Sequence, residues 1–244
     1  MGTKERRERE KDQVRAAILD AARELFVAYG YEGVSMRAIA EKIEYSPTVI
    51  YNYFKDKDAL ISELCQSDFG RLADHLHEAA RIADPAHRLC QCGREYVRFA
   101  LSHPNHYRLM FMTPYPQRPG DPVREQAKAE IKGNPETDAY AFLLALVQQV
   151  ADAGSLRGPN PNVQLVAQTL WAGLHGVISL QIALGADKDR TDWAPVETRT
   201  DAMLDALTFG LFSPDALPDA NSLSATGASE AASASGPSGP KEAR

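Results

Sequence analysis

Helical periodicity is the feature that most constrains how this 244-residue chain can fold. Apolar side chains recur every three or four residues between Val14 and Tyr29, and again between Met36 and Ile43. Sustained alternation with β-branched residues, which would indicate half-buried strands, is nearly absent from the sequence. The pattern therefore predicts an all-α protein.

Proline and capping residues set the expected limits of the helices. Ser35 can cap a short second helix, Ser46-Pro47 begins a third, and Asp56 caps a fourth that runs to about residue 82. The proline-rich segment 113–121 is expected to be a loop. Proline dipeptides divide the later chain into expected helices at 86–102, 104–112, 122–132, 136–153, 161–184 and 196–211.

The charge distribution limits how the chain can meet a polyanion. Its net charge is −6, yet residues 1–60 hold 11 basic and 11 acidic side chains, so the rest of the chain carries the whole negative excess. An architectural DNA protein usually relies on a broad basic surface, which this composition disfavours. Nucleic acid could approach only the N-terminal quarter, through a shaped site.

Composition also favours a cytoplasmic protein. The N-terminus has no apolar signal region, and three cysteines are too few and too unevenly spaced for a disulfide framework. The most apolar stretches are Ala141–Val150 and Val163–Leu184. The first is too short for a membrane span and the second is interrupted by polar residues, so we expect no membrane partner.

Residues 35–54 follow the plan of a helix-turn-helix: a short helix, a tight turn and a second short helix. The second helix is too short to be stable alone, so Ile50 and Phe54 are predicted to be its buried pair. Thr48 and Asn52 lie about 200° from Ile50 around the helix and should project outward, where they can contact base edges in a major groove. Phosphate contacts are expected from hydroxyl and ammonium groups around the same helix: Tyr51, Tyr53, Lys55 and Lys57.

Three motifs at fixed spacing occupy the same region: Ala21-Ala22-x-x-Leu25-Phe26-x-x-Tyr29-Gly30-Tyr31, Ser35-Met36-Arg37-x-Ile39-Ala40, and Tyr45-Ser46-Pro47-x-x-Ile50-Tyr51-x-Tyr53-Phe54-Lys55-x-Lys57-x-x-Leu60. Over about residues 12–72 they resemble the N-terminal domain of the TetR (tetracycline repressor) family of transcriptional regulators. The resemblance implies an all-helical homodimer with three N-terminal helices on DNA and a larger ligand-sensing domain. By position it implies base-facing Arg37, Pro47, Thr48, Val49 and Asn52 and phosphate-facing Ser35, Tyr51, Tyr53 and Lys57. With Ser46 and Lys55, these residues form the candidate DNA-binding set.

Glu44 departs from the family pattern, because the family usually has glycine between the second and third helices. Glycine tolerates a positive φ there, which glutamate adopts only at a cost. We therefore expect a strained or rearranged turn at Glu44, with its carboxylate pointing away from phosphate.

The C-terminal half carries a second resemblance. Leu170-Trp171-Ala172-Gly173-Leu174-His175-Gly176-Val177 is similar to the Trp-His-Gly helix of one C-terminal subgroup of the family, and Phe99-x-x-x-His103-Pro104-x-x-Tyr107-Arg108-Leu109-Met110-Phe111 fits the same subgroup. Such aromatic and thioether clusters are either plain core or adaptable pockets. The candidate ligand-binding residues are Phe99, His103, Tyr107, Met110, Phe111, Leu143, Trp171 and His175. Because these are apolar or uncharged, the expected effector is a small hydrophobic molecule.

Four segments are expected along the chain: a charged extension (1–11), a helix-turn-helix DNA-binding domain (12–72), an effector-binding and dimerisation domain (73–212) and a low-complexity tail (213–244) too poor in apolar residues to fold. Charge pairs four residues apart in the extension favour a solvated helix, and a groove-inserting arm is the alternative. Helices 161–184 and 196–211 are the most apolar, and Ala172, Gly173 and Gly176 would let a partner helix approach. We therefore expect these two helices to form the homodimer interface.

Catalytic, metal and cofactor sites are not expected. No nucleophile, carboxylate pair or phosphate-binding glycine loop has supporting context. Cys90 and Cys92 point about 200° apart on a helix, so a metal or redox sensor that also includes His87 is the less favoured interpretation. The sequence thus predicts a homodimeric repressor that binds a palindromic operator and is released by an apolar effector. The alternative is a helical small-molecule binding or carrier module without operator control.

Overall fold

The computed structural model describes residues 3–79, 81–114, 132–185 and 192–214. Across these ranges the protein is helical and contains no β-strand, which confirms the all-α prediction. The elements run in the order α1 (Thr3–Tyr29), α2 (Met36–Lys42), α3 (Pro47–Tyr51), α4 (Lys57–Ala79), α5 (Pro85–Ser102), α6 (Pro104–Tyr107), a π-helical turn η1 (Arg108–Met112), α8 (Ala139–Asp152), α9 (Val163–Leu184) and α10 (Val196–Leu211).

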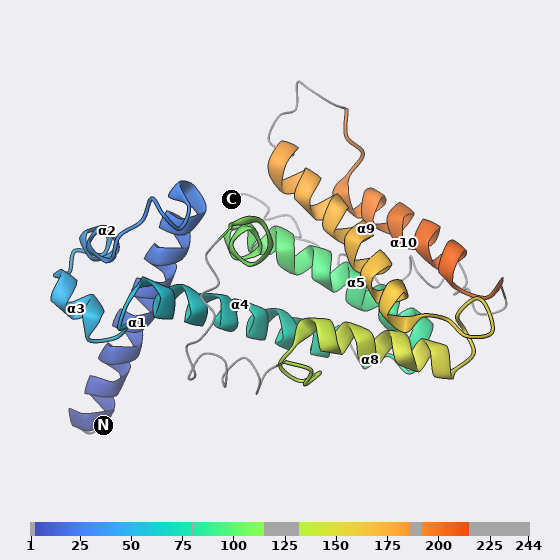
Figure 1. The fold of residues 1–244 in the computed structure, drawn as a ribbon, viewed down its shortest axis with the longest axis horizontal. Coiled ribbons are helices and arrows are strands. Elements are labelled where there is room, and N and C mark those ends of the chain that lie inside the picture. The colour runs from blue at the N-terminus through green and yellow to red at the C-terminus, as the bar shows by residue number, and fades with distance from the viewer. Residues whose placement is uncertain (1–2, 80, 115–131, 186–191, 215–244) are drawn as a thin grey trace, which may run out of the picture.

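Two hydrophobic cores organise the molecule. The N-terminal core lies between α1, α2, α3 and the start of α4, and its fully buried side chains include Ile18, Phe26, Ile39, Ile50 and Leu60. We call this part the head. The second core, in the body, is formed by the rest of α4 together with α5, α8, α9 and α10. Figure 1 shows α4 running from the head into the body, while α9 and α10 lie side by side along one edge of the body.

Capping residues explain why most helices begin where the sequence predicts. The Asp56 carboxylate accepts from the Ala59 backbone N–H at 2.8 Å, and Asp84 accepts from the His87 N–H at 2.6 Å. Ser35 accepts from the Ala38 N–H at 3.1 Å. Each cap satisfies a backbone donor that the first helical turn leaves free. The expected limits of 196–211 match α10.

Helix α8 begins three residues after the expected position. The helix predicted from residue 136 begins at Ala139, because Asn134 and Asp138 build a turn ahead of it. The Asn134 side chain accepts from the Glu136 N–H at 3.0 Å, and the Asp138 carboxylate accepts from the N–H groups of Tyr140 and Ala141. Asp138, not the proline dipeptide, therefore starts α8. The expected helix 122–132, most of the loop 113–121 and most of the tail lie outside the described residues.

The apolar character of α9 serves the fold. Among the described helices, α9 is the one long and apolar enough to cross a membrane by length and composition. Its side chains Val166, Leu170, Leu174 and Ile178 are buried in the body core. The helix packs against α5, α8 and α10, so these four apolar residues have partners within the protein.

Candidate nucleic-acid interface and ligand site

Helix α3 presents a polar face to solvent and an apolar face to the head core. Ile50 is fully buried and Phe54, just beyond the helix, is 2% exposed, so the predicted buried pair is confirmed. Thr48 and Asn52 are exposed on the opposite side. The helix is five residues long, so its orientation depends on this packing. The exposed side chains on and beside it are Ser46, Pro47, Thr48, Tyr51 and Asn52, with Val49 half-buried.

The turn before α3 holds the strained residue that the sequence predicts. Glu44 has φ 60°, and it is the one non-glycine residue with positive φ in the described ranges. The Glu44 N–H donates to the Glu41 carbonyl at 3.2 Å and the Tyr45 N–H donates to the Ala40 carbonyl at 2.9 Å. These bonds hold the turn against the cost of a left-handed glutamate. Glu44 itself is exposed.

Helix α2 offers two further predicted contacts. Arg37 is exposed, and its Nε donates to the Glu41 carboxylate at 2.7 Å. An exposed ion pair of this kind contributes little stability, so the terminal guanidinium nitrogens can bind another acceptor at small cost. Ser35 is exposed as well, although its hydroxyl oxygen already accepts the capping bond of α2.

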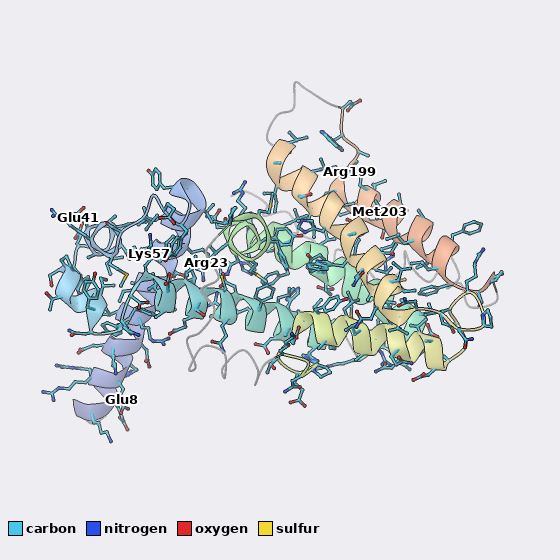
Figure 2. The ribbon with its side chains drawn as sticks, viewed as in Figure 1. Glu8, Arg23, Glu41, Lys57, Arg199 and Met203 are labelled. Atoms are coloured by element: carbon cyan, nitrogen blue, oxygen red, sulfur yellow. The ribbon has the colours of Figure 1, made fainter. Side chains whose placement is uncertain are left out.

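The contacts of Lys57 contradict the expectation that it faces a phosphate. Its ammonium donates to the backbone carbonyls of Tyr31 and Val34, at 2.7 and 2.9 Å, and lies 4.0 Å from the centroid of the Tyr31 ring. Figure 2 shows Lys57 inside the head, beside α1 and α2. This lysine therefore closes the loop between α1 and α2 and does not face a phosphate. Tyr53 is half-buried against the head core, whereas Lys55 is exposed.

Tyr45 is a candidate contact that sequence reasoning did not single out. Its side chain is 45% exposed and stands next to Ser46, while Tyr51 at the end of α3 is 54% exposed. Exposed tyrosine side chains thus lie just before α3 and at its end, where their hydroxyls can reach phosphate oxygens. The sequence offered one signal for Tyr45: it directly precedes Ser46, the N-cap residue of α3, so its hydroxyl lies beside the start of that helix.

In the body, four of the predicted ligand residues form one aromatic cluster. Phe111 lies at its centre, with ring-centroid distances of 4.8 Å to Tyr107, 5.8 Å to Trp171 and 5.9 Å to His175. Trp171 is 37% exposed and Tyr107 is fully buried, so the cluster reaches from the core to the surface. We call these four residues the aromatic cluster.

A chain of hydrogen bonds runs through the aromatic cluster. Trp171 Nε1 donates to the Tyr96 hydroxyl at 3.0 Å, the Tyr96 and Tyr107 hydroxyls are 2.9 Å apart, and the Tyr107 hydroxyl is 2.5 Å from His175 Nδ1. Burial lowers the pKa of His175, which favours neutral imidazole. If Tyr107 donates to Nδ1, Tyr96 donates to Tyr107 and every hydroxyl has a partner. This direction leaves the His175 proton on Nε2.

Tyr140 adds a buried polar atom with no partner. Its ring lies 5.8 Å from that of Trp171, and its hydroxyl oxygen is buried without a hydrogen bond to any described residue. An unsatisfied buried hydroxyl is costly, so such an atom calls for an explanation. Neither Tyr96 nor Tyr140 was predicted from the sequence, because each is separated from Trp171 by a long stretch of chain.

The remaining predicted ligand residues lie apart from this cluster or in plain core. Phe99 is buried, with its ring 5.2 Å from that of His103 and 5.9 Å from that of His75. His103 is exposed at the corner between α5 and α6, apart from the aromatic cluster, so its role in ligand binding stays a prediction. Met110 is 8% exposed in the body core and Leu143 is half-buried against it.

The alternative of a metal or redox sensor depends on Cys90 and Cys92, and both of these cysteines are buried. Burial raises the pKa of the Cys90 thiol to about 11 and that of Cys92 to about 12, so both stay protonated at neutral pH. No group of three or more metal-binding side chains occurs within the described residues. His75 and His77 on α4 are half-buried, because the His77 ring meets the Phe142 ring edge-on and His75 lies against Glu95.

Known proteins resemble the chain over both halves. Residues 18–64 match the family model of bacterial regulatory proteins of the tetR family, and residues 89–207 match that of the tetracyclin repressor-like C-terminal domain. The HTH-type transcriptional regulator Rv1816 of Mycobacterium tuberculosis is 26% identical over 198 residues, which cover 72% of this chain and 85% of that protein. The repressor AcnR of Corynebacterium efficiens is 26% identical over 184 residues, with the same coverage.

Solved structures share the fold. The crystal structure of a tetR-family regulatory protein from Rhodococcus RHA1 superposes with a TM-score of 0.60 at 19% identity, and the match covers 80% of this chain and 95% of that one. The C-terminal match names no subgroup, so the resemblance to the Trp-His-Gly subgroup stays a prediction.

Proposed function

The chain belongs to the TetR family of bacterial transcriptional regulators, and from this premise we propose that it represses transcription as a homodimer on a palindromic operator and is released by a small apolar effector. Its relatives and its fold are those of transcriptional regulators, not of enzymes. The observation that carries the proposal is the placement of Thr48 and Asn52, exposed on α3 opposite the buried Ile50. We expect the protein to act in the cytoplasm.

Readout of the operator rests on α3 and its neighbours. Short hydroxyl and amide side chains on an exposed helix can reach base edges, and Asn binds adenine through two hydrogen bonds. Tyr45, Tyr51 and Lys55 surround this face and can hold phosphates, which fix the register of the helix in the groove. Ser46, Pro47 and Val49 would complete the contact at the start of α3.

A homodimer is supported by an exposed stripe along α9. Leu165, Ala172, Gly176 and Leu180 recur on one side of the helix, and Leu165 and Leu180 are 59% and 45% exposed. A Cβ built on Gly176 meets no atom within 4 Å, so space is open for a second helix there. Exposed apolar surface of this kind marks an interface. Phe209 on α10 is 68% exposed, and we include it in the proposed interface because α10 packs beside α9.

Gly173 has a different role from the one the sequence predicts. A Cβ on Gly173 would come within 2.8 Å of Leu207 and 3.1 Å of the Met203 sulfur. Both belong to α10 of the same chain, so this glycine lets α9 and α10 pack closely within one subunit. Figure 2 shows Met203 between the two helices.

Effector release would use the connection between the aromatic cluster and the head. Phe111 belongs to the aromatic cluster, whereas Leu109 on the same turn η1 is fully buried in the head core. An effector that displaces Phe111 would therefore disturb the packing of α1 on η1. To release DNA, the effector must bind the conformation with low DNA affinity more tightly than the DNA-bound one. The aromatic cluster contains no charged side chain, which favours an apolar, uncharged ligand.

In vitro selection tests the proposal directly. Duplexes with a random central region are bound to the purified protein, recovered and sequenced over successive rounds. A repressor of this kind should enrich a palindrome whose half-sites lie about 34–36 Å apart, or a multiple of it. Thr48→Ala and Asn52→Ala should each weaken binding to the selected duplex by about 1–3 kcal/mol and leave binding to random duplex unchanged. A small-molecule carrier would enrich no sequence.

A further inference from the structure

The N-terminal turns of α1 extend beyond the head core. Every side chain from Lys4 to Gln13 is exposed, whereas Ile18 is fully buried. Figure 2 shows this end of the helix, around Glu8, projecting past α2 and α3. The extension is thus an ordered continuation of a head helix, and its faces have fixed directions relative to the head.

One face of the extension is basic. Lys4, Arg7 and Lys11 follow each other at spacings of three and four residues, which places them in one row along the helix. The row continues through Arg15 and Ile18 into the head. The acidic residues of the same turns lie on both sides of this row: Glu5, Glu8 and Asp12 centre about 100° to one side, and Glu10 lies about 90° to the other.

At the head end of the row, Arg15 lies between helix α4, where it pairs with Glu63, and Phe54 in the segment that follows α3. Ile18, at the end of the row, shares the head core with Ile50 of α3. The Arg15 guanidinium lies 5.4 Å from the centroid of the Phe54 ring. Phe54 lies three residues after the end of α3. Beyond Arg15, therefore, the row leaves the head close to the chain segment that contains Lys55, an exposed residue of the surface proposed to bind the operator.

The charges of this row are not neutralised within the protein. Lys4, Arg7 and Lys11 form no ion pair with any residue in the described ranges. On the other faces, Arg6 pairs with Glu10 at 3.2 Å and Arg9 donates to the Glu5 carbonyl at 3.3 Å. Arg15 is likewise paired, with Glu63 of α4. Among the described cations of the extension, those without an ion pair or a side-chain hydrogen bond are thus the three residues of the basic row.

We propose that Lys4, Arg7 and Lys11 bind backbone phosphates of duplex DNA that flanks the operator half-site. The inference rests on the proposed function and extends it beyond α2 and α3, because the extension would contact DNA outside the bases that α3 reads. The contacts are electrostatic and independent of sequence, so they add affinity and salt dependence but no base preference.

Two double variants that remove equal charge test whether the basic row, and not the other side of the extension, binds DNA. The double substitution Arg7→Gln with Lys11→Gln removes two charges from the basic row, and Arg6→Gln with Arg9→Gln removes two from the other side. Each protein is titrated at several salt concentrations onto the selected operator in two forms: trimmed to the operator, and carrying about 15 base pairs of arbitrary sequence on each side, more than one helical turn. Circular dichroism and thermal unfolding confirm that the variants are folded.

The expected result is specific to one face and one duplex. Each neutralised phosphate contributes about 0.9 to the slope of log affinity against log salt, so a dimer with four substitutions in the row should lose about 3–4 from that slope on the flanked duplex. The loss should be less than about 1 on the trimmed duplex, and the Arg6 and Arg9 variant should behave like the wild type on both. Equal slopes for all three proteins on the flanked duplex would overturn the proposal, and so would equal losses for the two variants. If the wild type selects no duplex at all, the proposed function itself fails.

Discussion

The Arg23 guanidinium on α1 donates two hydrogen bonds to the Asp68 carboxylate on α4, from Nε to Oδ2 at 3.0 Å and from Nη2 to Oδ1 at 2.8 Å. Asp68 is fully buried and Arg23 is 5% exposed. His106 on α6 reaches the same carboxylate, with Nδ1 2.9 Å from Oδ1. Burial alone would raise the pKa of Asp68, but hydrogen bonds from His106 and Arg23 hold it below its usual value. One carboxylate thus joins the head, the connecting helix and the body.

Asp68→Asn should destabilise the protein by about 3–5 kcal/mol, because it leaves the buried Arg23 charge without its main partner. Asp20→Asn is the matched control: Asp20 also pairs with Arg23, at 2.7 Å, but its side chain is 67% exposed. That change should cost less than about 1 kcal/mol. Urea unfolding measures both free energies. Similar losses in the two variants would show that burial of the pair does not determine its contribution.

Stability should fall as the pH drops below about 6.5, the usual pKa of histidine. Burial lowers the pKa of His175, and burial together with the nearby His106 charge lowers that of His103. The unfolded chain therefore takes up protons in a range where the native state does not, and acid favours unfolding. The stabilising contribution is complete above the unfolded pKa and is lost as the pH falls through the lower native pKa. The Asp68 contribution is lost only in stronger acid, below about 3.9.

Urea midpoints at pH 7.5, 6.5 and 5.5 check this sign. His175→Gln keeps an acceptor for the Tyr107 hydroxyl but cannot take up a proton, so its stability should depend less on pH over this range than that of the wild type. A variant with the same or a steeper decline would contradict the assignment of a buried, neutral His175.

Substitutions at Lys55 and Lys57 should affect different properties, DNA binding in the first case and stability in the second. Lys57→Met removes an ammonium that donates to the Tyr31 and Val34 carbonyls, so it should lower stability by about 1–3 kcal/mol. Lys55→Met removes an exposed charge beside α3 and should leave stability within about 0.5 kcal/mol. Its effect should appear as weaker binding to both specific and random duplex, with a lower salt slope. Thermal unfolding and a salt titration of DNA binding separate the two roles.

This lysine pair also shows what the sequence can and cannot predict. Helix order and the outward direction of Thr48 follow from periodicity and capping, which are local properties. The bond from Lys57 to Tyr31 spans 26 residues, and the contact of Gly173 with Leu207 depends on how α9 meets α10. Neither leaves a local signal: a lysine after a recognition helix and a glycine in an apolar helix are compatible with several partners.

The aromatic cluster illustrates the same division. Tyr107, Phe111, Trp171 and His175 could be singled out from the sequence because they lie in two stretches that resemble one C-terminal subgroup of the family. Tyr96 and Tyr140 complete the hydrogen-bonding picture, yet they come from α5 and α8 and lie in no motif. Only the packing of three helices, α5, α8 and α9, brings them to Trp171.

Replacing an exposed apolar residue of α10 with a charge should dissociate the proposed homodimer. Phe209→Glu places a carboxylate on a surface that is 68% exposed in the single chain, so folding should survive while the partner contact is lost. Tyr29→Glu, at a site 67% exposed in the head, is the control and should stay dimeric. Light scattering at micromolar concentration measures both. If the Phe209→Glu protein is dimeric, the interface does not include this part of α10. If the wild type is monomeric, the proposed homodimer is wrong.

The unpartnered hydroxyl of Tyr140 gives a test of the ligand site. Tyr140→Phe deletes a buried polar atom that has no partner among the described residues, so the unliganded protein should be unchanged or more stable, by up to about 1–3 kcal/mol. Phe111→Ala, by contrast, removes a large side chain from the aromatic cluster and should destabilise the protein by up to about 3–5 kcal/mol. The two variants therefore separate a polar contact with a ligand from the packing of the core.

An effector that binds beside Trp171 can supply the missing partner for Tyr140 with a single oxygen or nitrogen atom. We expect a thermal-shift screen to yield apolar, uncharged compounds that carry one or two hydrogen-bonding groups and that release the selected operator. Such a compound should stabilise the wild type more than Tyr140→Phe, because the variant lacks the hydroxyl that it would bind, whereas both proteins should hold the operator equally well without it. A compound that stabilises and releases both proteins equally would show that Tyr140 takes no part in ligand binding. If the compounds that release DNA are small multivalent anions or metal ions, the aromatic cluster is packing alone and the effector binds elsewhere.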